Sequence, residues 1–212
     1  MEGIFSNSFS PEIVIDMLFY FLETKLINTL VKQNKYCYFC RMNSSLKITF
    51  LGTGTSTGIP LIGSSHPVCL SKNIKDKRLR SSIKVDFDSH TYIIDCGPDF
   101  RQQIISSNCK RIDGILFTHE HADHTAGLDD IRPFCFRNGA LPIYGHKRVL
   151  DNLSVRFNYI FKTDNKYPGA PSVIPNYIDS NSYLILNKCK VLPISYLHAD
   201  LQVFGYRFND FA

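Results

Sequence analysis

The sequence predicts an α/β domain in which helices cover mixed β-sheets. From residue 46 onward, strand-like apolar runs alternate with helix-like stretches. Loop material concentrates at 52–58, 62–77 and 165–176, the last of these rich in Pro. The 212 residues are 44% hydrophobic and 20% charged, which provides for one substantial core and excludes a disordered or fibrous protein.

The expected strands are Leu46–Leu51, Ser82–Phe87, Thr91–Cys96, Gly114–Thr118, Leu141–Tyr144, Tyr183–Leu186, Cys189–Ile194 and Val203–Phe208. Between the second and the third, Asp88-Ser-His90 predicts a hairpin turn. The expected helices are Asp99–Asn108, Thr125–Phe136 and Lys147–Phe161. Strands and helices therefore follow one another through a single domain over residues 46–212.

Residues 1–45 differ in character from this domain and are interpreted as an N-terminal extension. They hold an amphipathic segment, Ile13 to Val31, and Cys37-Tyr-Phe-Cys40, half of a zinc-ribbon pattern without a second half. Met42 stands just before the first expected strand, so the native domain could begin there. Two interpretations stay open: upstream sequence that is not native to the protein, or a genuine helix that packs on the domain.

No membrane or secretory segment is expected. The longest uninterrupted apolar run, Met17 to Leu22, is six residues, whereas a bilayer span needs roughly 20. Seven cysteines, an odd number, in a chain without a secretory signal favour reduced thiols and a cytoplasmic location. The net charge of +5 permits an anionic ligand without requiring one, since the cations are scattered apart from Lys72 to Arg80.

The segment most informative about chemistry is His119-Glu-His-Ala-Asp-His124, which directly follows an expected strand. His119 and His121, two apart in an extended stretch, project to the same side and can share one ion. Asp123 and His124 follow the turn and can reach a second ion. Imidazole and carboxylate ligands suit zinc and also Fe or Mn. The spacing differs from the zincin helix motif, because the position that should carry its second His is Asp123.

Thr118-His-Glu-His-Ala-Asp-His124 resembles the H-x-H-x-D-H signature of the metallo-β-lactamase fold hydrolases. Further segments resemble the branch that contains the phosphoribosyl 1,2-cyclic phosphate phosphodiesterases and, more distantly, the tRNA 3′-processing endonucleases. They are Leu51–Pro60, Arg78–Ser82, Ile93–Gln102 and Gly127–Arg132. The resemblance covers residues 46–212 and implies an αββα sandwich, here lacking its last strands and helix.

The resemblance implies two divalent metal ions, with zinc as the first choice and Mn or Fe as alternatives. Their ligands would be His119, His121 and His198 for the first ion, and Asp123 and His124 for the second. Asp95 corresponds to the family's acid that holds a ligand imidazole in the right tautomer. On the residues alone, His198 at a strand end would be interpreted as structural, and Asp95 as a turn or capping residue.

The function implied is hydrolysis of a small phosphodiester, of the cyclic ribose phosphate type, by a metal-bound hydroxide that Asp123 ligates and orients. The Gly-rich stretch Gly52 to Gly58 could offer backbone N–H groups to a phosphate oxygen, and Arg80 could approach an anionic substrate. Ordinary turns and a solvated face are the more common explanations of these two features, so no substrate-binding residue is assigned.

The chain departs from the family's pattern at its end. The pattern continues past Val203–Phe208 with an Asp that bridges both metals and a later His, whereas this chain ends at residue 212. Neither Asp200 nor Asp210 stands where the bridging ligand belongs. We therefore expect an incomplete second site, a truncated chain and at most marginal phosphodiesterase activity until the missing strands are added.

A second departure lies in the loop at 63–69. Relatives in this branch often carry Cys where Ser64 and His66 stand, and these form a small structural zinc site with Cys69. Here only Cys69 and His66 could ligate, so this extra site is not expected.

Two other functions remain open. One is a tRNA 3′-processing-like nuclease or another hydrolase on the same scaffold, since a fold does not fix a substrate. Against a large RNA, the sequence shows no long basic arm or aromatic-rich clamp. The other is an inactive metal-binding fragment, which the early C-terminus supports. A homodimer is compatible with each of these functions.

Overall fold

The computed structural model describes residues 37–38 and 46–209, which form two β-sheets and one set of helices. A seven-stranded sheet has the order β1-β2-β3-β4-β5-β6-β7, and a three-stranded sheet has the order β10-β9-β8. The first sheet consists of β1 (Cys37–Tyr38), β2 (Lys47–Gly52), β3 (Ser82–Phe87), β4 (His90–Ile94), β5 (Gly114–Leu116), β6 (Leu141–Gly145) and β7 (Val173–Tyr177). The second consists of β8 (Leu184–Leu186), β9 (Cys189–His198) and β10 (Leu201–Phe208). The α/β class with mixed sheets is thereby confirmed, since β1 to β4 pair antiparallel and β4 to β7 pair parallel.

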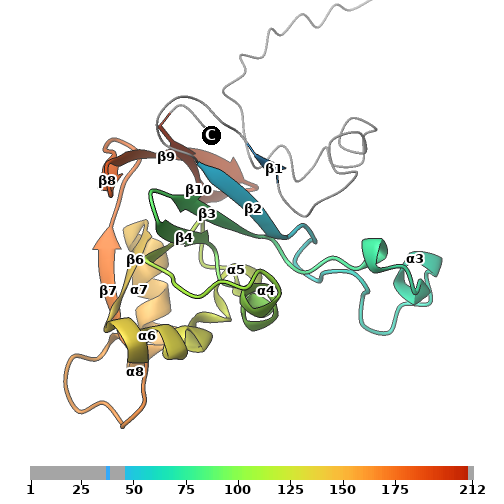
Figure 1. Cartoon of the computed structure of the whole chain (residues 1–212), viewed down its shortest axis with the longest axis horizontal. Coiled ribbons are helices and arrows are strands. Elements are labelled where there is room, and N and C mark those ends of the chain that lie inside the picture. Colours follow the sequence, from blue (N-terminus) through green and yellow to red (C-terminus); the bar gives the residue numbers. More distant parts are fainter. Residues whose placement is uncertain (1–36, 39–45, 210–212) are drawn as a thin grey trace, which may run out of the picture.

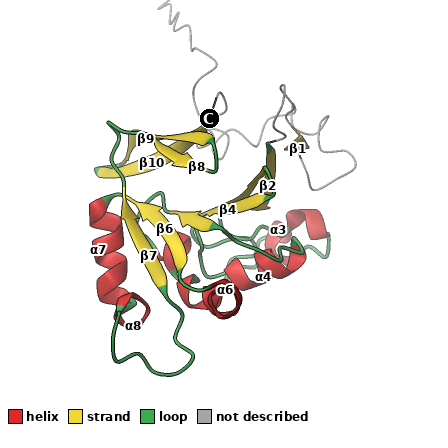
Figure 2. Ribbon diagram, turned by 60° about the vertical axis from the view of Figure 1, so that its left-hand side comes forward, coloured by secondary structure: helices red, strands yellow, loops and turns green. Residues whose placement is uncertain are grey.

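The helices are short, and most of them lie on the face of the large sheet opposite the small one (Figure 2). They are α3 (Pro67–Leu70), α4 (Phe100–Ser106), α5 (Ala122–Thr125), α6 (Arg132–Asn138), α7 (Lys147–Arg156) and α8 (Asn158–Phe161), with 3₁₀ turns η1 (Ile74–Asp76) and η2 (Leu128–Ile131). Residues 61–77 project from the body of the domain and carry α3 (Figure 1). Among the described residues, no helix is long and apolar enough to cross a membrane.

The central strands of the large sheet are buried on both faces, and the alternation of their side chains creates two cores. In β4, Ile93 points to the helices while Tyr92 and Ile94 point to the small sheet. In β5, Ile115 belongs to the helix side and Leu116 to the small-sheet side. This double burial explains why these strands have continuous apolar runs rather than the alternating pattern of a half-exposed sheet.

The hairpin prediction is confirmed. β3 has the expected bounds, and Phe87 pairs with His90 across the turn. Asp88 and Ser89 both adopt positive φ, 45° and 65°, which is the conformation of a two-residue type I′ turn.

Two helix predictions were wrong in their continuity. The expected helix at 125–136 is divided into α5, η2 and α6. Gly127 separates the first two, because its N–H bonds the carbonyl of Cys96 at 2.9 Å instead of continuing a helix. The expected helix at 147–161 is divided into α7 and α8 at Phe157, whose φ and ψ of −118° and 42° are not helical.

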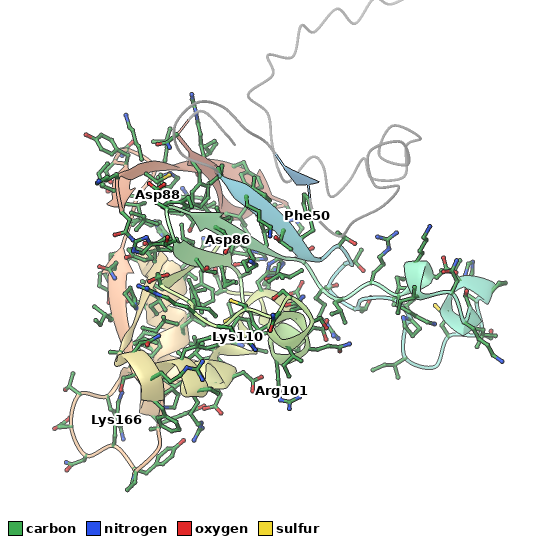
Figure 3. All side chains as sticks on the ribbon, viewed as in Figure 1. Phe50, Asp86, Asp88, Arg101, Lys110 and Lys166 are labelled. Carbon is green, nitrogen blue, oxygen red and sulfur yellow. The ribbon has the colours of Figure 1, made fainter. Side chains whose placement is uncertain are left out.

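The segment expected as a Pro-rich loop contains β7, an edge strand of the large sheet. Pro175 lacks a backbone N–H, and edge strands tolerate that loss. The loop that leads into β7 is held by Lys166, whose Nζ donates to the carbonyl of Ile160 at 2.7 Å and to Ser172 Oγ at 2.8 Å (Figure 3).

The interpretation of residues 1–45 as an extension, and Asp210 at the other end, lie almost entirely outside the described residues. The described pair Cys37–Tyr38 forms β1, which pairs antiparallel with β2 through Cys37 and Ile48.

Candidate metal centre

The predicted site residues come from three separate parts of the chain. Asp95 follows β4, residues 119–124 follow β5 and run into α5, and His198 ends β9 in the other sheet. Because β4 and β5 are parallel neighbours, the residues after them leave the sheet at the same edge. The ring of His119 lies 4.6 Å from that of His121, 4.2 Å from that of His124 and 5.9 Å from that of His198, measured between centroids. The structure therefore brings the four histidines together.

Within this cluster, two pairs of donor atoms have the spacing of metal ligands. His119 Nε2 lies 3.1 Å from His121 Nδ1, and His124 Nε2 lies 3.2 Å from Asp123 Oδ2. Two nitrogens bound to one tetrahedral zinc at about 2.0–2.1 Å would lie about 3.3 Å apart. Each pair thus fits two ligands of one divalent ion, and the chemistry of the donors suits zinc, Fe or Mn.

A third ligand is not in place beside either pair. Over residues 37–38 and 46–209, no three His, Cys, Asp or Glu side chains converge closely enough to hold an ion. His198, the expected third ligand of the first pair, has its ring centroid 6.1 Å from that of His121. Asp200 lies in the exposed turn between β9 and β10.

Asp95 is the buried anchor of the cluster, only 3% exposed and in a left-handed backbone conformation with φ of 61°. Its Oδ1 accepts the Thr118 backbone N–H at 2.8 Å. Its Oδ2 accepts the Thr118 hydroxyl at 2.7 Å and pairs with His124 Nδ1 at 2.6 Å. The carboxylate thus fixes a proton on His124 Nδ1 and directs the Nε2 of that ring toward Asp123.

Thr118 extends the same control to the first histidine. Because its hydroxyl hydrogen is given to Asp95, its oxygen can only accept from His119 Nδ1, at 2.9 Å. This places the proton of His119 on Nδ1 and leaves the Nε2 lone pair facing His121. Sequence reasoning missed this role of Thr118; its position directly before the first histidine was the available signal.

The protonation states follow from burial and charge. Burial, then the charge of His124, lower the pKa of His119 to about 4, so this ring is neutral at pH 7 as a metal ligand must be. A hydrogen bond from His124 lowers the pKa of Asp123 to about 2. Burial alone would lower the pKa of His124, but Asp95 and Asp123 together outweigh it and raise that pKa to about 10.

In the metal-free chain, His124 is therefore expected to stay protonated up to about pH 10, and His119 to stay neutral down to about pH 4. Since a raised pKa means the proton is held more tightly, an ion must displace the Nε2 proton of His124 to bind there. An NMR titration of the imidazole resonances checks this expectation. In Asp95→Asn, the pKa of His124 should fall back toward 6.5; a pKa near 6.5 in the wild-type chain would contradict the argument.

The close packing of this site depends on two glycines. A Cβ on Gly97 would lie 1.9 Å from the carbonyl oxygen of Asp123, and one on Gly127 would lie 2.2 Å from that of Gly97. This contact lets Cys96 N–H bond the carbonyl of His124 at 2.9 Å. The end of β4 and α5 are thereby joined through their backbones.

The Gly-rich loop at 52–58 and Arg80 support one another. The Arg80 guanidinium pairs with Asp99 Oδ1 at 2.9 Å, and its Nε donates to the carbonyl of Ser56 at 3.0 Å. These contacts assign Arg80 a bracing role between the loop and the start of α4.

His66 and Cys69 are occupied within the projecting segment. His66 Nδ1 caps α3 by accepting Val68 N–H at 3.2 Å, and Cys69 Sγ accepts Leu61 N–H at 3.4 Å.

Comparison with known proteins gives a family match and several relatives. The family described as "Beta-lactamase superfamily domain" matches residues 90–211. A curated octanoyltransferase of Porphyromonas gingivalis is 37% identical over 168 residues, 79% of this chain and 34% of that protein. A ribonuclease Z of Methanococcus maripaludis is 35% identical over 151 residues, 67% of this chain and 44% of that protein.

Among solved structures, a "New Diphosphatase from the PhnP Family" is 35% identical with a TM-score of 0.70, covering 78% of this chain and 62% of that one. The chain thus spans between a third and a half of the two curated relatives and about three fifths of the diphosphatase.

Proposed function

Because the chain belongs to the beta-lactamase superfamily domain family, we propose that it is a metal-dependent hydrolase of a small phosphodiester of the cyclic ribose phosphate type. The observation that carries the proposal is the pair of donor sets, 3.1 Å and 3.2 Å apart within each set, on rings whose centroids lie 4.2 Å apart. Two-metal phosphoesterases place their ions about 3.5–4 Å apart, a separation that two neighbouring donor sets can serve.

The residues of this chain would hold and orient the reactants. Divalent ions, with zinc favoured by the donors, would supply water activation and neutralise charge on the phosphoryl group. His119, His121 and His198 would hold the first ion, and Asp123 and His124 the second. Asp123, ionised at neutral pH since its pKa is about 2, can also accept a hydrogen bond from the attacking water and orient it.

The choice of a small ester rests on the relatives. Both a diphosphatase and a ribonuclease act at phosphorus, so attack at a phosphoryl group is the chemistry that the two names share. The diphosphatase combines 35% identity with a TM-score of 0.70, which favours the small substrate.

A nuclease is the second candidate, and the projecting segment 61–77 favours it. The sequence indicated no long basic arm, yet this segment extends away from the body and exposes both cations, Lys72 and Lys75, and apolar side chains, Ile62 and Ile74. Cations beside exposed apolar side chains are compatible with contacts to a nucleic acid.

The test combines metal analysis with two substrate classes. The wild-type chain is expected to bind divalent metal by elemental analysis and to hydrolyse bis(p-nitrophenyl) phosphate and cyclic ribose phosphates at no more than a marginal rate, though in preference to RNA, because the second site has only two ligands. His121→Ala should lose the first ion and the hydrolysis. His90→Ala, in the hairpin turn with its Nδ1 2.7 Å from the carbonyl of Asp88, is the matched control and should retain both.

Each alternative has its own outcome. Metal with cleavage of RNA but not of small esters indicates the nuclease. Metal without any hydrolysis indicates a metal-binding chain that is not catalytic. A wild-type chain that binds no divalent metal contradicts the proposed function altogether.

A further inference from the structure

The residue between the first two histidines points away from them. Chain alternation sends the Glu120 side chain to the opposite side from His119 and His121. There it meets Arg148 of α7, with Nε 2.9 Å from Oε1 and Nη2 3.1 Å from Oε2. Nη2 makes the hydrogen bond to this carboxylate, while Nε lies within ion-pair distance of Oε1 without making a hydrogen bond; the Glu120 side chain is mostly buried, at 17% exposure.

The same guanidinium also reaches the small sheet. Arg148 Nη2 donates to the backbone carbonyl of Gln202 at 2.5 Å. Gln202 pairs with Leu197 in the β9–β10 hairpin, next to the pair formed by Leu201 and His198. One side chain therefore contacts both the 119–124 loop and the hairpin that carries His198.

Helix α7, which carries Arg148, is held in place by its buried side chains. Val149, Leu150 and Leu153 are at most 1% exposed in the core between the large sheet and the helices. Two turns after Arg148, Arg156 Nη1 donates to the backbone carbonyl of Glu120 at 2.8 Å. The loop is thus held by the helix through both the side chain and the backbone of Glu120.

The candidate metal centre depends on the distance between the segment 119–124 and the β9–β10 hairpin, and Arg148 contacts both. The His198 ring belongs to the hairpin, and it lies 5.9 Å and 6.1 Å from the rings of His119 and His121. Two hydrogen bonds join β10 to the residues that precede His119: Phe204 N–H donates to Thr118 O at 3.0 Å, and Tyr206 Oη donates to Phe117 O at 2.6 Å. Arg148 adds a third connection at Glu120, the residue between His119 and His121.

We propose that Arg148 is a positioning residue that sets the distance between the His119–His121 loop and His198, and so the affinity for the first metal ion. The proposal rests on the proposed function, since it assumes the metal centre. Lysine cannot replace it fully, because its single ammonium group has no second nitrogen to lie beside Glu120 Oε1 while the first contacts Glu120 Oε2 and the Gln202 carbonyl.

Arg148→Lys is therefore expected to weaken binding of the first ion about 10- to 100-fold, the range found for residues that orient metal ligands. Zn²⁺ affinity is measured by competition with a chromophoric chelator, and the geometry by the visible absorption of the Co²⁺-loaded chain. Glu120→Gln should also weaken binding. The double variant should lose no more affinity than Arg148→Lys alone, because both substitutions remove the same contact between Arg148 and Glu120. Lys147→Gln is the matched control, because that side chain is 72% exposed and its ammonium group pairs with Asp151.

The melting temperature of each metal-free variant separates positioning from general stability. A merely structural role would lower that temperature and leave the Co²⁺ spectrum of the folded fraction unchanged, which would overturn the proposal. Wild-type affinity in Arg148→Lys would overturn it as well. Should Arg148→Lys fail to fold, Glu120→Gln decides, since it retains the bond to Gln202. A wild-type chain that binds no metal defeats the proposed function and this inference together, whereas tight wild-type binding with unchanged variants defeats this inference alone.

Discussion

Asp95→Asn is expected to weaken metal binding at the Asp123–His124 pair about 10- to 100-fold while the chain still folds. The amide oxygen can keep one of the bonds from Thr118, but the amide nitrogen is a donor where Oδ2 was an acceptor. His124 can then no longer direct Nδ1–H at residue 95, so its Nε2 is not held ready for an ion. Isothermal titration with Zn²⁺ measures the loss.

The substitution is a clean probe because asparagine tolerates the left-handed backbone that residue 95 adopts, with φ of 61°. Asp88→Asn is the matched control: the same exchange at φ of 45° in the exposed hairpin turn, which should leave metal affinity at the wild-type value. Equal affinities in Asp95→Asn and the wild-type chain would show that the carboxylate does not orient the ligands.

The spacing of neighbouring residues predicted part of the candidate site, whereas the rest depends on contacts between residues far apart in the sequence. His119, His121, Asp123 and His124 are consecutive enough that their spacing alone indicated shared ions. Asp95 and His198 lie more than 20 residues from that segment, so only the family resemblance pointed to them. The pairing of Glu120 with Arg148, 28 residues apart, had no sequence signal, because it depends on how α7 packs against the loop.

The same distinction explains the fold. The β3–β4 hairpin was predictable, since its strands and its turn are adjacent in sequence. β7 was not, because Pro171 and Pro175 conceal a strand that exists only through its pairing with β6. The division of the helix after His124 was equally hidden, since Gly127 breaks it to bond Cys96, a partner about 30 residues earlier.

The close approach of the Gly97 backbone to that of Asp123 leads to the largest expected effect on stability. Gly97→Ala would place a methyl group 1.9 Å from the Asp123 carbonyl oxygen and 2.9 Å from its carbon, atoms of a backbone that cannot swing aside. We expect α5 to be pushed from the end of β4, at a cost of about 3 kcal/mol or more, the upper range for overpacking. For a chain of this size the melting temperature should fall by about 6–12 °C.

Because α5 carries Asp123 and His124, the same variant should lose ion binding at that pair, and a thermal melt and a Zn²⁺ titration of one sample report both effects. Gly205→Ala is the matched control: its methyl group would meet Tyr196 Cε1 at 3.5 Å, an ordinary contact, so its melting temperature should stay within about 2 °C of the wild-type value. A wild-type melting temperature in Gly97→Ala would mean that β4 and α5 do not pack this closely. A fall in melting temperature with metal affinity preserved would mean that the second donor pair does not depend on that contact.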